Sequence, residues 1–546
     1  MRRSLLCYFL FFMMGTSGWC RPESVDAVGI FSRAWELVET RFYDPDLKGV
    51  EVDEIRARFL PRVAKAPGDL VKLTNESLGL LKASHTELLS RAEPRYYQLL
   101  DVFAHGSPQS EEIRRLFGGR LPHYVGILAV VEEGVVKAVV PGGPSARAGL
   151  RGGDVVLSVD GAPFQAIESF RGRAGRKTKM RVKRGDEELM LSVTPEDIQP
   201  REAFLRSIEE SAEVWELPPY RVGYVRMWSY AGEAYQEKLK QVLLGKLRDT
   251  DGLVLDLRGS WGGASPHFAE LFRSQTDLTL KRRKDDPATL KSEHYGEPLM
   301  LVSDETVSSG KELLAYNLQR SGRAKLAGTP TRGAVLGGAL HLLPDGHALY
   351  LAQADVLVGG ERLEGIGVFP DYEAFPEPGQ EFDDSLRQAR GRLLEQLIQR
   401  DLQRRWHIDQ LPWPEKQAKN LDVKNQAWLR KLLENHGWPS RELYGRWAQT
   451  AWLIAQHADN DLEFQKWALN LLRKAVEQSR APAKERAYLE DRVLINQGLP
   501  QIYGTQIEKK DGRIVPRALR DPEGVEERRK SVGLPPLGEY LEGRFE

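Results

Sequence analysis

The chain has 546 residues and a mass of 61.7 kDa, which predicts three or four domains at roughly 100–200 residues per domain. Its 78 basic and 78 acidic residues balance, so it lacks the basic excess that is expected of a dedicated nucleic-acid binder. The chain contains two cysteines, Cys7 and Cys20, and this number excludes a disulfide scaffold and a cysteine-rich zinc site.

The first twenty residues have the order of a secretory signal peptide. A basic pair precedes the apolar stretch 5–14, and small residues follow at 15–18. The apolar stretch is shorter than the ~20 residues that span a bilayer. We therefore predict an exported protein, periplasmic or secreted, that is cleaved after Gly18 or Cys20. A lipid-anchored Cys20 ranks second because Trp19 is bulkier than a lipobox residue, and an uncleaved anchor is a further alternative.

Residues 24–118 have a helical pattern. Four apolar residues recur at the spacing of one helix face, namely Phe31, Ala34, Trp35 and Val38. Pro45 ends this helix, because the residue before a proline is disfavoured in the α region. A second helix ends near Ser84-His85-Thr86. We predict a helical unit that precedes the first β-rich segment.

Residues 119–200 change to a strand pattern. Two β-rich runs, 125–131 and 135–140, precede a glycine-rich segment at 141–150 and a strand that ends in the turn Asp160-Gly161. This order resembles the PDZ fold, and a generic small β-domain is the alternative. The resemblance implies a short helix at 145–148 and a groove that binds a peptide strand by edge addition, often with its terminal carboxylate.

Residues 201–376 alternate between strands and helices, which is typical of an α/β domain. The predicted strands are 222–228, 253–257, 299–302 and 325–327, and the predicted helices are 233–247, 266–272 and 309–318. Asp345-Gly346 predicts the turn of a hairpin over 342–351.

The remainder is predicted to be helical, with a linker at 377–422 that contains Pro412-Trp413-Pro414 and a separate unit at 423–546. Four helices are predicted, at 423–435, 440–457, 461–477 and 482–496, with Ser440 and Asp461 as N-caps. The unit resembles a helical domain of unknown function. Five of its polar residues either line a pocket or form packing pairs, and we favour packing pairs: His457, Asp459, Arg492, Tyr503 and Gln506.

The first candidate catalytic residue is Ser309, which lies between a buried strand and a helix. A helix N-terminus offers free N–H groups and a positive dipole end to an oxyanion. A serine at this place is more often an N-cap when it occurs alone. Another buried strand earlier in the chain, 254–257, runs into a glycine-rich loop at 258–263, where backbone N–H groups can approach a ligand closely.

These segments, together with Ser84-His85-Thr86 and Glu364-Gly365-Ile366-Gly367, resemble the C-terminal processing, or tail-specific, serine peptidases. That family also includes tricorn core peptidases and retinol-binding-protein-like modules. The similarity runs from about residue 31 to 371. It implies a multidomain α/β protein: a crotonase-like α/β peptidase core with an N-terminal helical cap, an inserted PDZ-like β-domain and a C-terminal all-α domain.

The resemblance places the nucleophile at Ser309. Members with a Ser-Lys dyad carry the lysine 25 positions later, where this chain has Ala334, so the dyad is absent. Arg332 cannot replace it, since a guanidinium does not deprotonate to act as a base. Lys311 lies two residues along the helix and is expected to point elsewhere.

The tricorn-like branch uses a histidine and a glutamate instead. The resemblance assigns these roles to His85 and Glu364, with Ser84 as a fourth polar member, and Glu364 orients the histidine directly or through Ser84. A neutral imidazole takes the serine proton and returns it to the leaving amine. The oxyanion hole is predicted at the N–H of Gly310 plus one from the glycine loop, with Gly262 first and Gly263 second.

The leading prediction is an exported serine endopeptidase that cleaves protein or peptide substrates captured by the PDZ-like domain, without metal or cofactor. It has no nucleic-acid partner and no membrane span after signal removal. The alternative is a catalytically inactive, peptidase-like binding scaffold, in which Trp261 of the glycine loop narrows or blocks the cleft. A weaker alternative makes the C-terminal unit a second enzyme.

Overall fold

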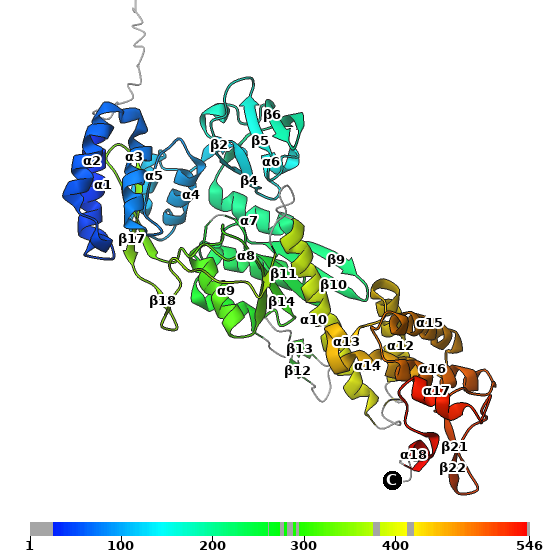
Figure 1. Ribbon diagram of the computed structural model, residues 1–546. Helices are drawn as coiled ribbons and strands as arrows, with labels where there is room; N and C mark the ends of the chain where they lie inside the picture. The colour runs from blue at the N-terminus through cyan, green and yellow to red at the C-terminus, as the bar shows by residue number, and fades with distance from the viewer. Residues whose placement is uncertain are drawn as a thin grey trace, which may run out of the picture.

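The computed structural model describes residues 26–259, 261–273, 278–280, 288–290, 294–374, 383–411, 416 and 420–542. The predicted signal peptide, Ser260 and the predicted Pro412-Trp413-Pro414 linker lie outside the described residues. A helical cap and a helical C-terminal unit lie at opposite ends of an α/β core, and a small β-domain lies beside the cap (Figure 1).

The cap begins with the predicted amphipathic helix. Phe31, Ala34, Trp35 and Val38 are all fully buried, and the helix ends at Arg41 before the proline-containing turn. The cap elements are α1 (Ala27–Arg41), η1 (Leu47–Gly49), α2 (Val52–Lys65), η2 (Pro67–Asp69), α3 (Leu70–Leu78), η3 (Gly79–Leu81), β1 (Glu87–Leu89), α4 (Pro94–Phe103) and α5 (Ser110–Leu116).

The β-domain contains a five-stranded antiparallel sheet in the order β3-β4-β5-β6-β7. Its elements are β2 (Tyr124–Gly126), β3 (Ala129–Glu132), β4 (Val135–Val139), α6 (Pro144–Arg147), β5 (Val155–Val159), η4 (Glu168–Phe170), β6 (Thr178–Arg184), β7 (Glu187–Val193) and β8 (Glu196–Ile198). The predicted run 125–131 is divided. Leu128 has a φ of 56°, which breaks the strand, so β2 pairs with β8 and β3 becomes an edge strand of the sheet.

The core has a six-stranded sheet in the order β20-β15-β14-β11-β10-β9, in which β9 alone is antiparallel to its neighbour. Its strands are β9 (Glu213–Leu217), β10 (Tyr220–Arg226), β11 (Gly252–Asp256), β14 (Leu299–Ser303), β15 (Ala324–Gly328) and β20 (Tyr372–Glu373). Its helices are α7 (Pro200–Ser211), α8 (Glu233–Leu244), η5 (Pro266–Phe272) and α9 (Gly310–Arg320). Two short strands, β12 (Leu278–Leu280) and β13 (Ala288–Leu290), pair antiparallel. The central strands are buried on both faces, as their continuous apolar sequences predict.

The predicted hairpin forms β16 (Gly337–Leu342) and β17 (Ala348–Ala354), followed by β18 (Leu357–Val358) and β19 (Glu361–Arg362). The partner of this hairpin was not predicted from the sequence. Strand β1 of the cap adds to β17, with Glu87 opposite Tyr350. This pairing brings the segment after His85 to the core.

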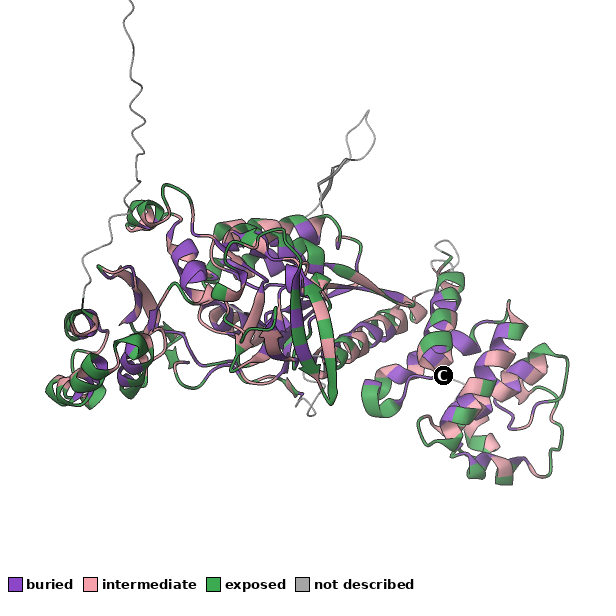
Figure 2. Ribbon diagram, turned by 90° about the horizontal axis from the view of Figure 1, so that it is seen from above, coloured by how far each residue is buried: buried purple, intermediate pink, exposed green. Residues whose placement is uncertain are grey.

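The helix α10 (Asp383–Asp409) connects the core to the C-terminal unit. One hydrophobic cluster contains residues of the sheet, of α10 and of the C-terminal helices, so the two parts share a core. In Figure 2 the buried residues gather around the central sheet and continue along α10.

The C-terminal unit contains α12 (Leu421–His436), α13 (Arg441–Tyr444), η6 (Gly445–Ala448), α14 (Gln449–Gln456), α15 (Leu462–Glu477), α16 (Ala483–Asn496), β21 (Ile507–Lys510), β22 (Arg513–Pro516), α17 (Val525–Ser531) and α18 (Leu537–Glu542). Ser440 and Asp461 cap their helices as predicted. Two details differ from the prediction. Gly445, with a φ of 55°, divides the helix expected at 440–457, and the unit includes a short hairpin, β21–β22. No helix in the described part of the chain is long and apolar enough to span a membrane.

Candidate active site

Ser309 lies in a sharp turn between β14 and α9. Its φ of 57° and ψ of −134° are unusual for a residue with a side chain, and such a backbone persists only where its surroundings hold it. Its N–H donates to the carbonyl of Ala334 at 2.7 Å and approaches Glu312 Oε2 at 3.1 Å. A strained strand-to-helix turn is the geometry that presents a nucleophilic hydroxyl at a sheet edge.

Glu312 stabilises this turn, although the sequence analysis did not identify it. Its fully buried carboxylate accepts hydrogen bonds from the N–H groups of Gly333 and Ala334, at 2.7 and 2.8 Å, and from the Thr331 hydroxyl at 2.5 Å. Burial raises the pKa of Glu312. A Ser-x-x-Glu spacing at a helix start is the sequence signal that could have revealed this role.

The glycine loop packs directly against the serine turn. A Cβ atom on Gly262 would lie 2.6 Å from Ser309 Cβ, and a Cβ atom on Gly310 would lie 2.3 Å from the backbone nitrogen of Ala264. Both positions therefore require glycine. Among the described residues, the N–H groups of Gly262, Gly263 and Gly310 have no hydrogen-bond acceptor. They are the groups that the sequence analysis assigned to an oxyanion hole.

A buried ion pair starts this loop. Asp256 Oδ2 accepts from Arg258 Nη2 at 2.7 Å, and both side chains are buried. Burial alone would raise the pKa of Asp256, but the charge of Arg258 outweighs it and the pKa falls to about 2. Lys311, also buried, donates to the carbonyls of Trp228 and Leu257 at 2.8 and 3.0 Å. As predicted, Lys311 points away from the serine hydroxyl.

Ser84, His85 and Glu364 form a chain of hydrogen bonds. Ser84 Oγ lies 2.8 Å from His85 Nδ1 and 2.9 Å from Glu364 Oε2, and the Ser84 N–H donates to Glu364 Oε1 at 2.9 Å. Because a carboxylate only accepts, the Ser84 hydroxyl donates to Glu364 and accepts from the Nδ1–H of His85. This arrangement leaves the lone pair of the histidine on Nε2.

The environment of His85 favours the neutral imidazole. Burial lowers its pKa to about 4, and the nearby Glu364 and Glu87 carboxylates only partly oppose that effect. His85 itself has a φ of 53°. A neutral histidine with a free Nε2 lone pair is a competent general base.

Glu364 also connects the histidine to the serine turn. Its Oε2 accepts from the N–H groups of Val335 and Leu336, at 2.9 and 3.3 Å, while the neighbouring Ala334 binds the N–H of Ser309. The structure thus brings Ser84, His85 and Glu364 into contact. The N–H of Ser309 binds Ala334, and the next residue, Val335, binds Glu364. Among the described residues, no hydrogen bond joins His85 to the Ser309 hydroxyl. The lysine-dyad position, Ala334, is buried and carries no functional group.

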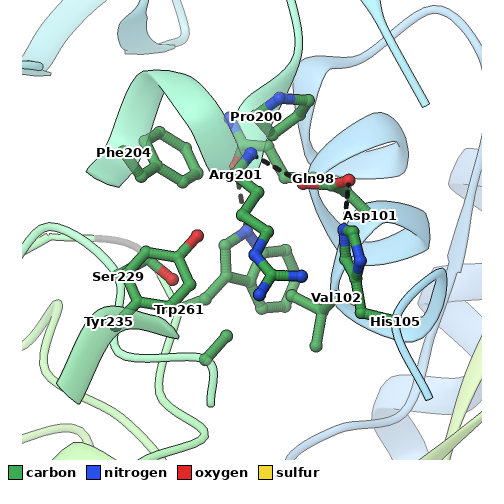
Figure 3. Close-up of a pocket in the computed structure, with 11 residues that line it drawn as sticks. Gln98, Asp101, Val102, His105, Pro200, Arg201, Phe204, Ser229, Tyr235 and Trp261 are labelled. Carbon is green, nitrogen blue, oxygen red and sulfur yellow. Dashed lines mark hydrogen bonds and ion pairs between the residues drawn. The ribbon is translucent and has the colours of Figure 1, made fainter. Parts of the chain in front are cut away.

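Trp261 turns toward the cap. Its indole Nε1 donates to Gln98 Oε1 at 3.0 Å. The Trp261 side chain lines a small polar pocket of about 10 Å³ between α4, the start of α7 and the core (Figure 3). In the same pocket Asp101 is buried beside His105, and burial raises the pKa of Asp101 to about 7.

The polar residues predicted in the C-terminal unit form packing pairs, as favoured. Asp459 pairs with Arg492, Arg492 Nη1 donates to Gln506 at 3.0 Å, and His457 contacts Asp409 at 3.0 Å. No group of three histidine, cysteine or acidic side chains suited to a metal ion occurs in the part of the chain that the structure describes.

Four family models match successive parts of the chain. Residues 27–79 match the Tricorn protease C1 domain, 135–184 the PDZ domain, 221–374 Peptidase family S41, and 403–544 a family of unknown function (DUF6624). The last match begins inside α10.

Several related proteins are described as proteases. A carboxyl-terminal-processing protease of Picosynechococcus sp. is 26% identical over 369 residues, which cover 65% of this chain and 84% of the relative. The protein of the same description from Synechocystis sp. is 24% identical, over 62% of this chain and 79% of its own. A tricorn protease homolog of Streptomyces coelicolor is 25% identical, over 64% of this chain and 30% of its own. The chain is a serine peptidase with a family S41 core and a PDZ domain.

Proposed function

We propose that Ser309 is the nucleophile of this peptidase, His85 its general base, and Ser84 and Glu364 the groups that orient the base. The observation that carries the proposal is the Glu364–Ser84–His85 hydrogen-bond chain, which fixes one imidazole tautomer. The strained turn at Ser309 supports it, because such strain is concentrated at functional sites.

In this mechanism His85 Nε2 takes the proton of the Ser309 hydroxyl as the oxygen attacks the carbonyl carbon of the scissile peptide. The N–H of Gly310 and one N–H of the glycine loop, Gly262 or Gly263, stabilise the resulting oxyanion. The imidazolium then protonates the leaving amine, and a water molecule hydrolyses the acyl-enzyme by the same steps. Glu364 compensates the positive charge of His85 through Ser84. Every group that takes part in these steps, apart from water and the substrate, is a side chain or backbone N–H of the protein.

The substrate proposed is an extended segment of a protein or peptide, held by the PDZ domain. Strand β3 is an edge strand, so one side of its backbone has no partner in the sheet. An edge of this kind binds a peptide as an additional strand, through main-chain hydrogen bonds that require no particular sequence. We also propose that residues 1–20 direct export, as their basic–apolar–small order predicts. N-terminal sequencing of the purified protein tests this part.

The central experiment combines active-site labelling with substitution. A fluorophosphonate should form one adduct on Ser309, and Ser309→Ala should abolish both the adduct and the hydrolysis of fluorescein-labelled casein. The neighbouring Ser308→Ala is the matched control and should retain both. Absence of any adduct in the unmodified protein, with casein bound but uncut, would instead favour the inactive scaffold.

A further inference from the structure

Trp261 precedes Gly262 and Gly263 in the glycine loop, and its side chain contacts the cap. Its backbone carbonyl accepts the N–H of Tyr230 at 3.1 Å, while the indole reaches the cap and donates to Gln98 on α4 (Figure 3). The residue is therefore anchored to the core by its backbone and to the cap by its side chain.

A first route leads from the indole to the strand beside His85. The guanidinium of Arg95 lies over the indole, 4.5 Å from the ring centroid, and Arg95 also pairs with Glu87 at 2.5 Å. Glu87 begins β1, two residues after His85. A cation over an indole face is favourable, and more so where water is partly excluded.

A second route passes through Tyr350 on β17. The Tyr350 ring centroid lies 6.4 Å from that of Trp261 and 5.1 Å from that of His85. Tyr350 also pairs with Glu87 in the register of β1 and β17. The two routes therefore converge on the segment 85–87.

We propose that Trp261 is a positioning residue that clamps the glycine loop to the helical cap and so fixes Gly262 and Gly263 relative to His85. The glycine loop needs such a contact because its glycines can adopt many backbone conformations. Gly259 and Gly263 have φ values of 123° and 86°, and segments rich in glycine lose the most conformational freedom when they are ordered. The catalytic meaning of the clamp rests on the proposed function, whereas its mechanical part does not.

Three variants cut the clamp at different points. Trp261→Ala removes every contact of the side chain with the cap. Trp261→Phe keeps an aromatic ring beside Arg95 and Tyr350 but removes the indole N–H. Gln98→Met keeps the indole N–H but removes its acceptor. Since a misplacement of about 1 Å can cost about a hundredfold in rate, we expect Trp261→Ala to lower kcat on labelled casein about a hundredfold with KM changed less than about threefold. Trp261→Phe should be intermediate. Gln98 also hydrogen-bonds Tyr124, so Gln98→Met has an effect of its own. In the double variant Trp261→Phe/Gln98→Met the losses in kcat should be less than additive, because both changes remove the same indole bond.

Hydrogen–deuterium exchange provides a readout that does not depend on peptidase activity. In Trp261→Ala the amides of 85–89 and 262–264 should exchange faster together, while those of the C-terminal unit stay unchanged. Trp467→Ala, a partly buried tryptophan on α15, is the control and should change neither kcat nor exchange at these segments. Unchanged exchange at both segments, or an unchanged kcat in an active enzyme, would overturn the clamp. A protein that shows the exchange effect but hydrolyses nothing would refute the proposed function alone.

Discussion

The hydrogen-bond chain behind His85 makes Glu364→Gln the most informative substitution. The carboxylate accepts from the Ser84 hydroxyl and from three backbone N–H groups, those of Ser84, Val335 and Leu336. A carboxamide is nearly the same size but presents one acceptor and one donor. Oε2 accepts from three donors and Oε1 from one, so the amide oxygen takes the Oε2 position and the NH₂ faces only the Ser84 N–H. The Ser84 hydroxyl then keeps its acceptor, and the main loss is that of the negative charge.

The effect of the lost charge follows from its distance to the imidazole. Two consecutive hydrogen bonds of 2.8 and 2.9 Å place the carboxylate within ~6 Å of the imidazole. At an effective dielectric constant of about 20, a unit charge at that distance stabilises the imidazolium by about 3 kcal/mol. That energy corresponds to a factor of about a hundred in rate. We therefore expect kcat to fall by about a hundredfold or more, with KM unchanged.

The assay is the rate constant for phosphonylation of Ser309 together with kcat and KM on labelled casein. Glu361→Gln is the matched control, because this exposed carboxylate on the same segment contacts only surface residues. A kcat of Glu364→Gln within about threefold of the unmodified enzyme would refute the proposed relay through Ser84.

Two further predictions follow from burial and from close packing. Since burial lowers the pKa of His85 to about 4, kcat/KM should fall only near pH 4. In the unfolded chain the pKa of a histidine is about 6.5, so the unfolded state binds the proton more readily. The free energy of unfolding should therefore fall as the pH drops from about 6.5 to 4. The difference between the unmodified protein and His85→Gln in urea unfolding at pH 7, 5 and 4 isolates this contribution, and identical pH dependence would contradict it. Gly262→Ala should abolish hydrolysis and destabilise the fold by about 1–3 kcal/mol, because its Cβ would lie 2.6 Å from Ser309 Cβ. Gly391→Ala, with open space around it in α10, should be neutral or stabilising; equal melting temperatures and activities for the two variants would show that the close approach at Gly262 is not required.

The residue at position 334 decides which type of catalytic base the site can use. Ala334 excludes a Ser-Lys dyad, and its backbone carbonyl instead binds the N–H of Ser309. Lys311, the nearest lysine along the chain, donates to the carbonyls of Trp228 and Leu257 instead. These two positions direct attention to a histidine base, which the sequence analysis located by resemblance to known peptidases.

The sequence by itself determined what depends on near neighbours in the chain. Helix periodicity predicted the buried face of α1, side-chain oxygens predicted the caps at Ser440 and Asp461, and continuous apolar runs predicted the buried strands of the core. These features follow from interactions over a few residues, and sequence spacing records them directly.

Only the tertiary structure decided how the site is supported. The Ser84–Glu364 bond joins residues 280 positions apart, β1 pairs with a strand of the distant hairpin, and Trp261 turns toward the cap rather than the cleft. Contacts of this kind depend on how whole elements pack. No local pattern in the sequence specifies which donor meets which acceptor across such a distance.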